Sequence, residues 1–272
     1  MKKVVIVIPI YKQVPSNNEV LSLKRCALVF PSTPILIIHP IGLDLSKYDE
    51  IFSKENICKE NFDATFFKNT DTYNRLLLDK RFYHRLKDFE NLLIYQPDAY
   101  VFENNLEYWT GKKYDYIGAP LIKNINNGVP DFIPFGGNGG FSLRNIPACI
   151  KTLSAFKIME SPNECIVYFK KFHSGFNLWL RFPLMLLRML GYRNNSKYYI
   201  RNFDANEDVF WSLKAGLIDK NFKVATATEE IPFAFEKQPA LLFKMNGNKL
   251  PFGCHAWEKH EPEFWKNHIP TN

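Results

Sequence analysis

Cysteine pairs, long hydrophobic runs and familiar catalytic loops are all scarce in this 272-residue sequence. The five cysteines are widely spaced and form no CxxC pair, which excludes the usual zinc-site and disulfide-framework patterns and indicates a reducing, cytoplasmic compartment. The N-terminal apolar run, Val4–Pro9, is too short for the core of a signal peptide and lacks a small-residue cleavage site. We therefore expect this run to be the first strand of the fold, with no export signal.

Three motifs that mark large enzyme classes are also missing. The sequence has no GxSxG, no GxxxxGK[ST] and no GxGxxG after the first apolar run, so hydrolase, P-loop and dinucleotide-binding functions lose their main support. What is present is typical of a folded protein, with 46% hydrophobic residues, 15% aromatic residues and a formal net charge of +7. The positive excess favours polyanionic partners such as nucleotide phosphates, anionic lipid or nucleic acid, without choosing among them.

Short β-branched runs alternate with helix-like stretches in the first half of the chain, which is typical of a parallel sheet with crossover helices. A proline follows four of these runs and should end each strand, because proline lacks the backbone donor of the sheet ladder. A helix is expected from about Thr70, capped by Thr70 or Asp71. The expected strands are Val4–Ile8, Ile35–Ile38, Thr65–Phe67, Leu92–Tyr95 and Tyr116–Ile117, and the prolines are Pro9, Pro40, Pro97 and Pro120.

The second half of the chain differs in composition. Glycine, asparagine and proline are frequent from Gly128, and Gly136–Gly140 is expected to form a flexible loop. A helical block follows, and the C-terminal part is expected to be rich in loops. Since no linker or repeat is visible, we predict one α/β domain over residues 1–272. Its sheet should be mostly parallel and flanked by helices, with a helical insert at about residues 165–200.

Asp98 is the first candidate for chemistry, because Gln96-Pro97-Asp98 directly follows a fully apolar strand. Ligands of parallel sheets bind outside the carboxyl ends of the strands, so an acid at this place lies beside a site. The alternative is structural, since an aspartate at a strand end readily bonds its own backbone in a turn.

Glu207 and Asp208 form the second candidate, two adjacent acids at the start of an amphipathic helix. Acids in a first helical turn complement the helix dipole, and this alone would explain them. The functional alternative is that one carboxylate removes a proton from a substrate hydroxyl, which contributes about 10²–10⁴-fold to a rate.

His255 is the third candidate and belongs to a proline-flanked C-terminal segment that we expect to be a loop. A loop histidine beside an aromatic residue is usually a packing or surface residue. Imidazole and carboxylate together nevertheless form a mixed donor set for Mn²⁺, so Asp98 and His255 would share a divalent ion if this segment folds over the sheet edge.

Five segments occur in an order that resembles a family of glycosyltransferases from bacterial surface-polysaccharide (O-antigen type) clusters, which is similar to the nucleotide-sugar-dependent GT-A class. The resemblance spans Val4 to Trp257, and its most specific strings are YDYIGAP and GGNGGFSLR. The segments are Leu92–Asp98, Tyr114–Pro120, Gly136–Arg144, Glu207–Phe210 and Gly253–His255.

The resemblance implies a Rossmann-like GT-A fold and a role for each candidate. Asp98 stands where GT-A enzymes have the last acid of the DxD motif, which holds a divalent ion on the donor diphosphate, and His255 matches the histidine that completes the metal site. Gln96 replaces the first acid of that motif. Mn²⁺ is therefore the expected cofactor and Mg²⁺ the alternative, while metal independence stays open. Glu207 and Asp208 match the acidic pair at the acceptor side.

The remaining implied site residues surround the sugar and the nucleotide. The glycine-rich segment would form the floor between donor sugar and acceptor, and the residues after the first strand would border the base. Departure of the diphosphate builds up negative charge that a cation or basic side chains must offset. These donor- and acceptor-binding residues are Pro9, Tyr11, Lys12, Arg75, Gln96, Gly137, Asn138, Gly139, Gly140 and Arg144.

The leading hypothesis is a glycosyltransferase that moves a hexose, with galactose as the specific guess, from a nucleotide diphosphate sugar to a hydroxyl of a lipid-linked or surface glycan, with inversion. The alternative is a non-catalytic module that binds nucleotide sugar or glycan on the same fold. Binding to nucleic acid ranks last, because the basic residues are dispersed and no nucleic-acid-binding motif is visible.

The insert between Tyr168 and Tyr199 is apolar, interrupted by Arg181, Pro183 and Arg188. It is too short and too charged for a membrane-spanning helix, which needs about 20 mostly apolar residues. Two interpretations remain, a buried helix of the C-terminal half or an interfacial helix on anionic lipid. The second would place the protein on the cytoplasmic face of the inner membrane.

Overall fold

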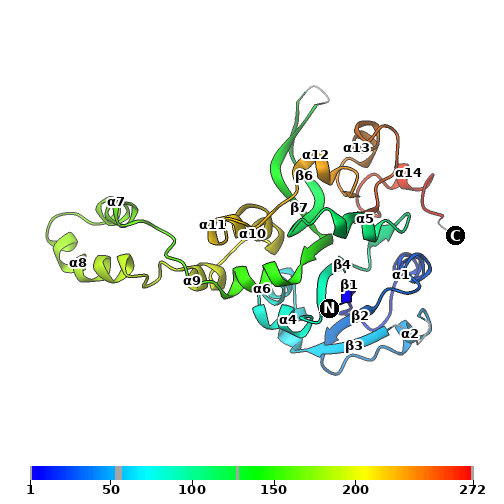
Figure 1. Cartoon of the computed structure of the whole chain (residues 1–272), viewed down its shortest axis with the longest axis horizontal. Coiled ribbons are helices and arrows are strands. Elements are labelled where there is room, and N and C mark those ends of the chain that lie inside the picture. Colours follow the sequence, from blue (N-terminus) through cyan, green and yellow to red (C-terminus); the bar gives the residue numbers. More distant parts are fainter. Residues whose placement is uncertain (1, 53–56, 127–128, 271–272) are drawn as a thin grey trace.

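A six-stranded mixed sheet forms the centre of the protein in a computed structural model that describes residues 2–52, 57–126 and 129–270 (Figure 1). The strand order is β3-β2-β1-β4-β7-β6. The strands are β1 (Lys2–Pro9), β2 (Ile35–Pro40), β3 (Ile57–Phe62), β4 (Phe89–Tyr95), β6 (Tyr116–Asn126) and β7 (Val129–Asn145). The predicted α/β class with a mostly parallel sheet flanked by helices is confirmed.

The order in which strands are added to the sheet reverses between β1 and β4, which are themselves parallel. From β1 the sheet grows through β2 to β3 on one side, whereas β4 pairs with β1 in parallel on the other side. β7 then pairs antiparallel with β4, and β6 pairs antiparallel with β7. The gap between the carboxyl ends of β1 and β4 is the place where open α/β sheets bind ligands.

Both faces of the sheet are buried, as expected for strands that are apolar at every position. In β1, Ile6 and Ile8 point into one core and Val5 and Val7 into the other. The first core is covered by α1 (Asn17–Val29), α2 (Ser46–Asp49) and α5 (Leu106–Gly111). The second is covered by α3 (Thr70–Leu77), α4 (Lys80–Arg85), α6 (Ile146–Ser154) and α10 (Glu207–Leu213).

A second, three-stranded sheet attaches the C-terminal part of the chain to the end of β4. Its order is β5 (Ala99–Val101), β9 (Gly253–His255) and β8 (Ala234–Phe235), and Ala99 faces His255 in the register. The expectation that residues 253–255 form a loop is therefore wrong. The short helices of the C-terminal half are α9 (Ser196–Arg201), α11 (Ala215–Ile218), α12 (Ala227–Glu230), α13 (Pro239–Met245) and α14 (Pro262–Trp265).

Several expected elements differ from the structure. Thr65–Phe67, expected to be a strand, belongs to the 3-10 helix η2 (Ala64–Phe67), and the edge strand β3 was not expected. The helix from Thr70 is two helices, α3 and α4, and its cap is Asn69, which forms a capping box with Thr72. Pro120 does not end β6, which continues to Asn126. Gly136–Gly140 is part of the strand β7 and not a flexible loop.

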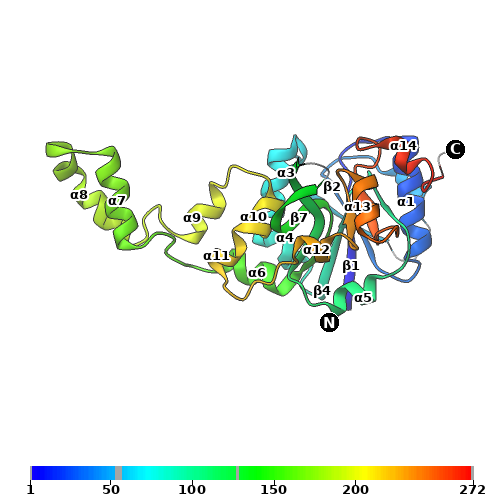
Figure 2. The same cartoon turned by 90° about the horizontal axis from the view of Figure 1, so that it is seen from above.

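The insert forms a helical hairpin, α7 (Pro162–Phe172) and α8 (Gly175–Met189), that projects away from the rest of the protein (Figure 2). Met185 is the one buried residue of α8, so the interpretation as a buried helix is wrong. Among the described residues no helix is both long and apolar enough to cross a bilayer.

Candidate active site

The predicted donor-site residues lie where two neighbouring parallel strands end. Pro9 is the last residue of β1, with Tyr11 and Lys12 directly after it, and Gln96 and Asp98 follow β4. Tyr11 is 58% exposed, so its ring is available to a ligand. The Lys12 ammonium lies 2.6 Å from the Glu19 carboxylate. Because β1 and β4 are adjacent and parallel, these residues share one edge of the sheet.

Asp98 and His255 meet at this edge, although they are far apart in the sequence. The pairing of β5 with β9 brings them together, and His255 Nε2 lies 3.2 Å from Asp98 Oδ1 and 2.9 Å from Gln96 Oε1. The structure therefore brings together the two side chains that the sequence paired only on the condition that this segment folds over the sheet edge. Sequence reasoning had no means of deriving this contact, because it depends on a pairing between distant strands.

Three further residues of this cluster were not expected from the sequence. Glu236, buried just after β8, places Oε1 3.5 Å from His255 Nδ1 and 4.0 Å from His260 Nε2. The ammonium of Lys259 lies 3.2 Å from Asp98 Oδ2. An acid directly after a short apolar strand is the signal that pointed to Asp98, and the same signal in Ala234-Phe235-Glu236 would have found Glu236.

The charges of this cluster compensate one another. Burial alone would favour neutral side chains, but the hydrogen bond to His255 and the charges of His255 and Lys259 hold the pKa of Asp98 well below its usual range. Burial is likewise outweighed at His255, where contacts with Asp98 and Glu236 raise the pKa to about 9. At neutral pH the cluster therefore carries an imidazolium and an ammonium beside the Asp98 carboxylate.

The donor set of this cluster does not fit Mn²⁺ in the arrangement described. A protonated imidazole has no lone pair for a metal, and Asp98 is engaged by His255 and Lys259. Among the described residues no group of three or more His, Cys, Asp and Glu side chains is arranged to hold a metal ion. Mn²⁺ dependence stays a prediction from the sequence.

Glu207 lies at the start of α10 and is paired with a fully buried arginine. Arg144 donates two hydrogen bonds to Glu207, at 3.0 Å from Nη1 to Oε2 and 2.9 Å from Nη2 to Oε1. Its remaining N–H groups are directed to the Ser142 and Tyr83 hydroxyls and the Gly139 carbonyl. With its donors used inside the protein, Arg144 holds Glu207 in a fixed place beside β7.

Asp208 is buried but has no arginine partner. Its Oδ1 accepts the Val209 N–H at 2.7 Å, and burial raises the pKa of the carboxyl group despite this hydrogen bond. A carboxylate with a raised pKa holds a proton more readily than an ordinary aspartate, which suits a general base.

Gly139 and Gly140 of β7 lie between two groups of side chains. The cluster with Asp98 and His255 is on one side, and Glu207 and Asp208 are on the other. A Cβ at Gly140 would overlap the imidazole of His255, and a Cβ at Gly139 would overlap the carboxylate of Glu207 and crowd Arg144, with Asp208 in ordinary contact. Both positions therefore require glycine for close approach. The structure thus brings His255, Glu207 and Asp208 against two adjacent residues of one strand, and Asp98 joins them through its contact with His255.

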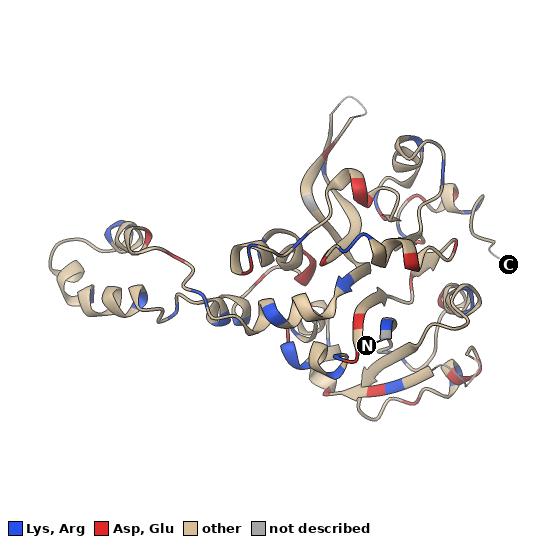
Figure 3. Cartoon of the chain, in the orientation of Figure 1, with Lys and Arg blue, Asp and Glu red and all other residues tan. Residues whose placement is uncertain are grey.

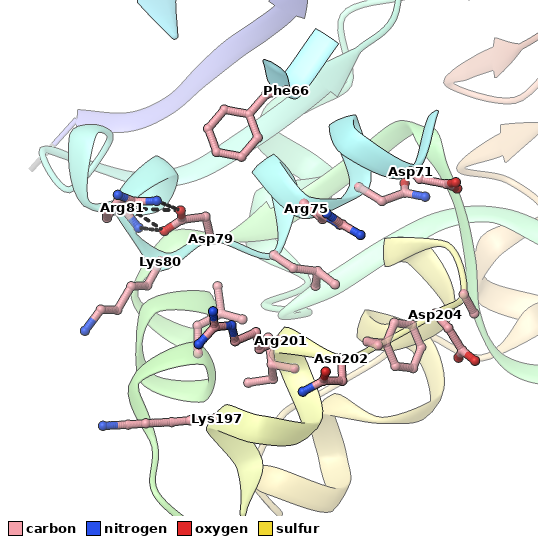
Figure 4. A pocket seen from close by; sticks show the side chains of 16 residues that line it. Phe66, Asp71, Arg75, Asp79, Lys80, Arg81, Lys197, Arg201, Asn202 and Asp204 are labelled. Carbon is pink, nitrogen blue, oxygen red and sulfur yellow. Dashed lines mark hydrogen bonds and ion pairs between the residues drawn. The ribbon is translucent and has the colours of Figure 1, made fainter. Parts of the chain in front are cut away.

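The other predicted residues are spread around this centre. Gly137 donates its N–H to Ser212 Oγ at 3.1 Å, and Asn138 accepts the Gly140 N–H at 2.8 Å. Arg75 lies apart from the Asp98–His255 cluster. It lines a pocket of about 770 Å³ between α3, α4 and α9 (Figure 4).

Comparison with known proteins places the chain in a family without assigning an activity. A family model described as "Protein of unknown function (DUF5672)" matches residues 56–255. The chain belongs to this family. Among the curated proteins no relative matches.

Solved structures show a general likeness of fold to this DUF5672 protein. An active-site mutant of LgtC is 10% identical, with a TM-score of 0.46, 98% of this chain covered and 91% of that one. The galactosyltransferase LgtC in complex with donor and acceptor sugar analogs is 11% identical, with a TM-score of 0.40 and coverages of 92% and 86%. The core-mannan synthase A of Aspergillus fumigatus, in its Mn/GDP form, is 9% identical, with a TM-score of 0.36 and coverages of 54% and 60%.

Glu230 is a further buried acid of this DUF5672 protein, and its effect on stability is testable. It is fully buried on α12, neither carboxyl oxygen has a hydrogen-bond partner among the described residues, and burial raises the pKa to about 10. A folded pKa above the unfolded value stabilises the fold at low pH, and this stability is lost as the pH rises from about 4.5 to 10. At pH 7 the loss is roughly 3 kcal/mol.

We expect Glu230→Gln to remove this loss, because glutamine does not ionise in the unfolded chain. Urea unfolding should show the variant to be more stable than the wild type by up to about 3 kcal/mol at pH 7, and the difference should vanish near pH 4. Glu90→Gln, at an exposed position of β4, is the matched control and should leave the free energy of unfolding unchanged. A gain that is equal at both pH values would contradict the titration of Glu230.

Proposed function

We propose that this protein is a glycosyltransferase that moves a hexose from a nucleotide diphosphate sugar to a hydroxyl group of a glycan acceptor. One observation carries the proposal: two acidic groups from distant segments flank Gly139–Gly140, beside the carboxyl ends of β1 and β4. One group contains cationic side chains suited to a diphosphate, and the other contains an aspartate with a raised pKa suited to a hydroxyl proton. The motif resemblance to the GT-A class agrees with this division.

In the proposed reaction Asp208 accepts the proton of the acceptor hydroxyl. The acceptor oxygen then forms a bond to the anomeric carbon, while the bond from that carbon to the diphosphate oxygen breaks and its electron pair stays on the diphosphate. Attack and departure on opposite faces invert the anomeric centre. Imidazolium His255, Lys259 and Lys12 lie where they offset the charge on the leaving group.

Glu207 has a different proposed role from the one that the sequence suggested. Because both of its carboxyl oxygens accept hydrogen bonds from Arg144, we assign it to positioning α10 and therefore Asp208. Galactose as the transferred sugar, a surface or lipid-linked glycan as the acceptor, and the cytoplasmic location remain predictions from the sequence.

The test is incubation of the protein with a panel of nucleotide diphosphate sugars and glycan acceptors, with Mn²⁺ and with a chelator. The expected result is release of nucleoside diphosphate together with a new glycoside of inverted configuration. Nucleotide binding by calorimetry without turnover on any donor would instead support the non-catalytic module. Activity that persists in the chelator would support charge neutralisation by His255 and Lys259.

The proposal includes contact of the α7–α8 hairpin with an anionic membrane surface. Large apolar side chains of the hairpin are exposed, among them Phe176 at 72% and Trp179 at 71%. The segment from Cys165 to Phe203 contains seven Lys and Arg residues and no Asp or Glu (Figure 3). Apolar side chains that enter the headgroup region, next to cations that meet anionic lipid, are the two features of an interfacial helix.

We expect Phe176→Glu/Trp179→Glu to lower binding to phosphatidylglycerol vesicles at least about tenfold, because two apolar anchors are replaced by charges that anionic lipid repels. Co-sedimentation with vesicles measures the effect, and wild-type binding should weaken with phosphatidylcholine alone or with high salt. Leu28→Glu, an exposed apolar position on α1, is the matched control. If the wild-type protein forms a dimer in solution and does not bind vesicles, the exposed face of the hairpin contacts a second copy of the chain instead.

A further inference from the structure

The pocket between α3, α4 and α9 has no role in the proposed reaction. Its volume is about 770 Å³, and it is lined by two segments that are far apart in the sequence, residues 66–81 and 197–205, together with Leu153 (Figure 4). Its walls include apolar side chains such as Phe66, Leu78 and Phe203. The pocket is therefore large enough for a sugar with a charged substituent and offers both apolar and polar contacts.

The polar lining includes cations without ion-pair partners in the described part of the chain. Arg81 is held by Asp79 in a bidentate contact and is not available to a ligand. No such partner exists among the described residues for the other four lining cations, which are Arg75, Lys80, Lys197 and Arg201. Like charges from two separate segments repel one another in the empty pocket, and an anionic ligand would relieve this repulsion.

Apart from Asp79, which is paired with Arg81, the lysines and the aspartates of the pocket lie on different sides (Figure 4). In Figure 4, Lys80 and Lys197 lie on one side of the view, whereas Asp71 and Asp204 lie on the opposite side. A ligand that matches this division has an anionic group at one end and hydroxyl groups, which donate to carboxylates, at the other. A glycosyl phosphate has this polarity.

The acidic side of the pocket includes residues that lie close to Asp208, the proposed base, in the sequence. Ala205 is part of the lining, and Asp208 follows three residues later at the start of α10. The side chain of Asn74, which also lines the pocket, donates a hydrogen bond of 3.1 Å to Asn206 Oδ1 and so fixes this turn against α3. Sugar hydroxyls held at the acidic side would therefore lie beside the segment that precedes Asp208 in the chain.

We infer that this pocket binds the phosphate-bearing end of the sugar acceptor, with the phosphate toward Lys197 and Arg201 and the sugar toward Asp204. The inference rests on the proposed function, because only a transferase gives the ligand the role of an acceptor. α9 supplies Lys197 and Arg201 and follows the α7–α8 hairpin in the chain. An acceptor anchored in a membrane would therefore meet the pocket next to the segment that contacts the lipid.

The test is calorimetric titration with glucose 1-phosphate and, as the neutral probe, methyl α-glucoside, with saturating nucleoside diphosphate present to fill the donor site. Wild-type protein should bind the phosphate probe at least about tenfold more tightly, and this preference should weaken with salt. Lys197→Ala/Arg201→Ala should lose the preference. The matched control is Lys87→Ala/Lys220→Ala, which removes two exposed lysines outside the pocket and should retain it.

Equal affinity of the Lys197→Ala/Arg201→Ala variant and the wild type for glucose 1-phosphate would overturn the inference. A lipid headgroup is the other source of phosphate, and phosphatidylglycerol vesicles test it. If the variant loses vesicle binding while its affinity for glucose 1-phosphate is unchanged, the pocket belongs to the lipid contact and the inference fails.

Failure of the proposed function gives a different result. A protein that shows the charge-dependent preference for glucose 1-phosphate but transfers no sugar from any donor would keep the pocket and lose the transferase. A protein that transfers sugar to neutral acceptors with no preference for the phosphate probe would support the proposed function and overturn the inference about the pocket.

Discussion

Asp208→Asn is expected to lower kcat for sugar transfer about 10²–10⁴-fold while leaving the fold intact. Asparagine retains the oxygen that accepts the Val209 N–H, but its amide has no basic site for the hydroxyl proton. Donor KM should stay within about threefold of the wild type, because the base acts on the acceptor. Initial rates with a saturating donor, followed by release of nucleoside diphosphate, measure the effect.

The pH profile separates loss of a base from a merely structural change. Since burial raises the pKa of Asp208, the acidic limb of the wild-type rate should lie above the ordinary range for aspartate. The residual rate of the variant should lack this limb. Asp88→Asn, at an exposed position, should reproduce the wild-type profile. Unchanged turnover in Asp208→Asn would remove Asp208 as the base and return Glu207 as the candidate.

Arg144→Met is expected to destabilise the fold by about 3–5 kcal/mol, because it leaves the buried Glu207 carboxylate without a compensating charge. The side chains of this pair are 0% and 5% exposed, so water cannot replace the lost hydrogen bonds. Urea unfolding at pH 7 measures the change in free energy. Arg181→Met, which removes an exposed arginine with no ion pair among the described residues, should change it by less than about 0.5 kcal/mol.

The double variant Arg144→Met/Glu207→Gln shows whether the cost comes from the unpaired charge. Removal of both partners should recover a large part of the stability, since a buried pair contributes little beyond the cost of desolvating its charges. Transfer activity should stay low in this variant, because α10 would no longer be held against β7 at Arg144. A loss of stability in the double variant that equals the sum of the losses in Arg144→Met and Glu207→Gln would contradict the pairing.

The core of the fold could be predicted from the sequence because the central residues of strands buried on both faces form a continuous apolar run. β1, β2 and β4 have this signature and were found within two or three residues at each end. β3 is an edge strand with the sequence ICKENF. Its polar residues interrupt the apolar run, so it could not be recognised by this signature. Local propensity failed in the same way at Thr65–Phe67, where Asp63 caps a 3-10 turn instead.

β7 was missed for a different reason. The segment Gly136–Gly140 has the composition of a loop, and only its neighbours explain why it is a strand. His255 packs on Gly140 and Glu207 on Gly139, and these contacts come from segments more than 60 residues away. The motif resemblance identified the candidate residues, but the contacts with Glu236 and Lys259 depend on the pairing of β5, β8 and β9 and could not be read locally.

The projecting hairpin has a geometric consequence for the choice of acceptor. If α8 rests on the bilayer, the arm from α7 to α9 fixes the height at which the sheet edge stands above the lipid. A lipid-linked saccharide shorter than this height could not extend its terminal residue to Asp208, whereas a longer one would have to bend. The length of the arm would then determine how many sugars an acceptor must already carry. A longer or shorter arm would change that number of sugars.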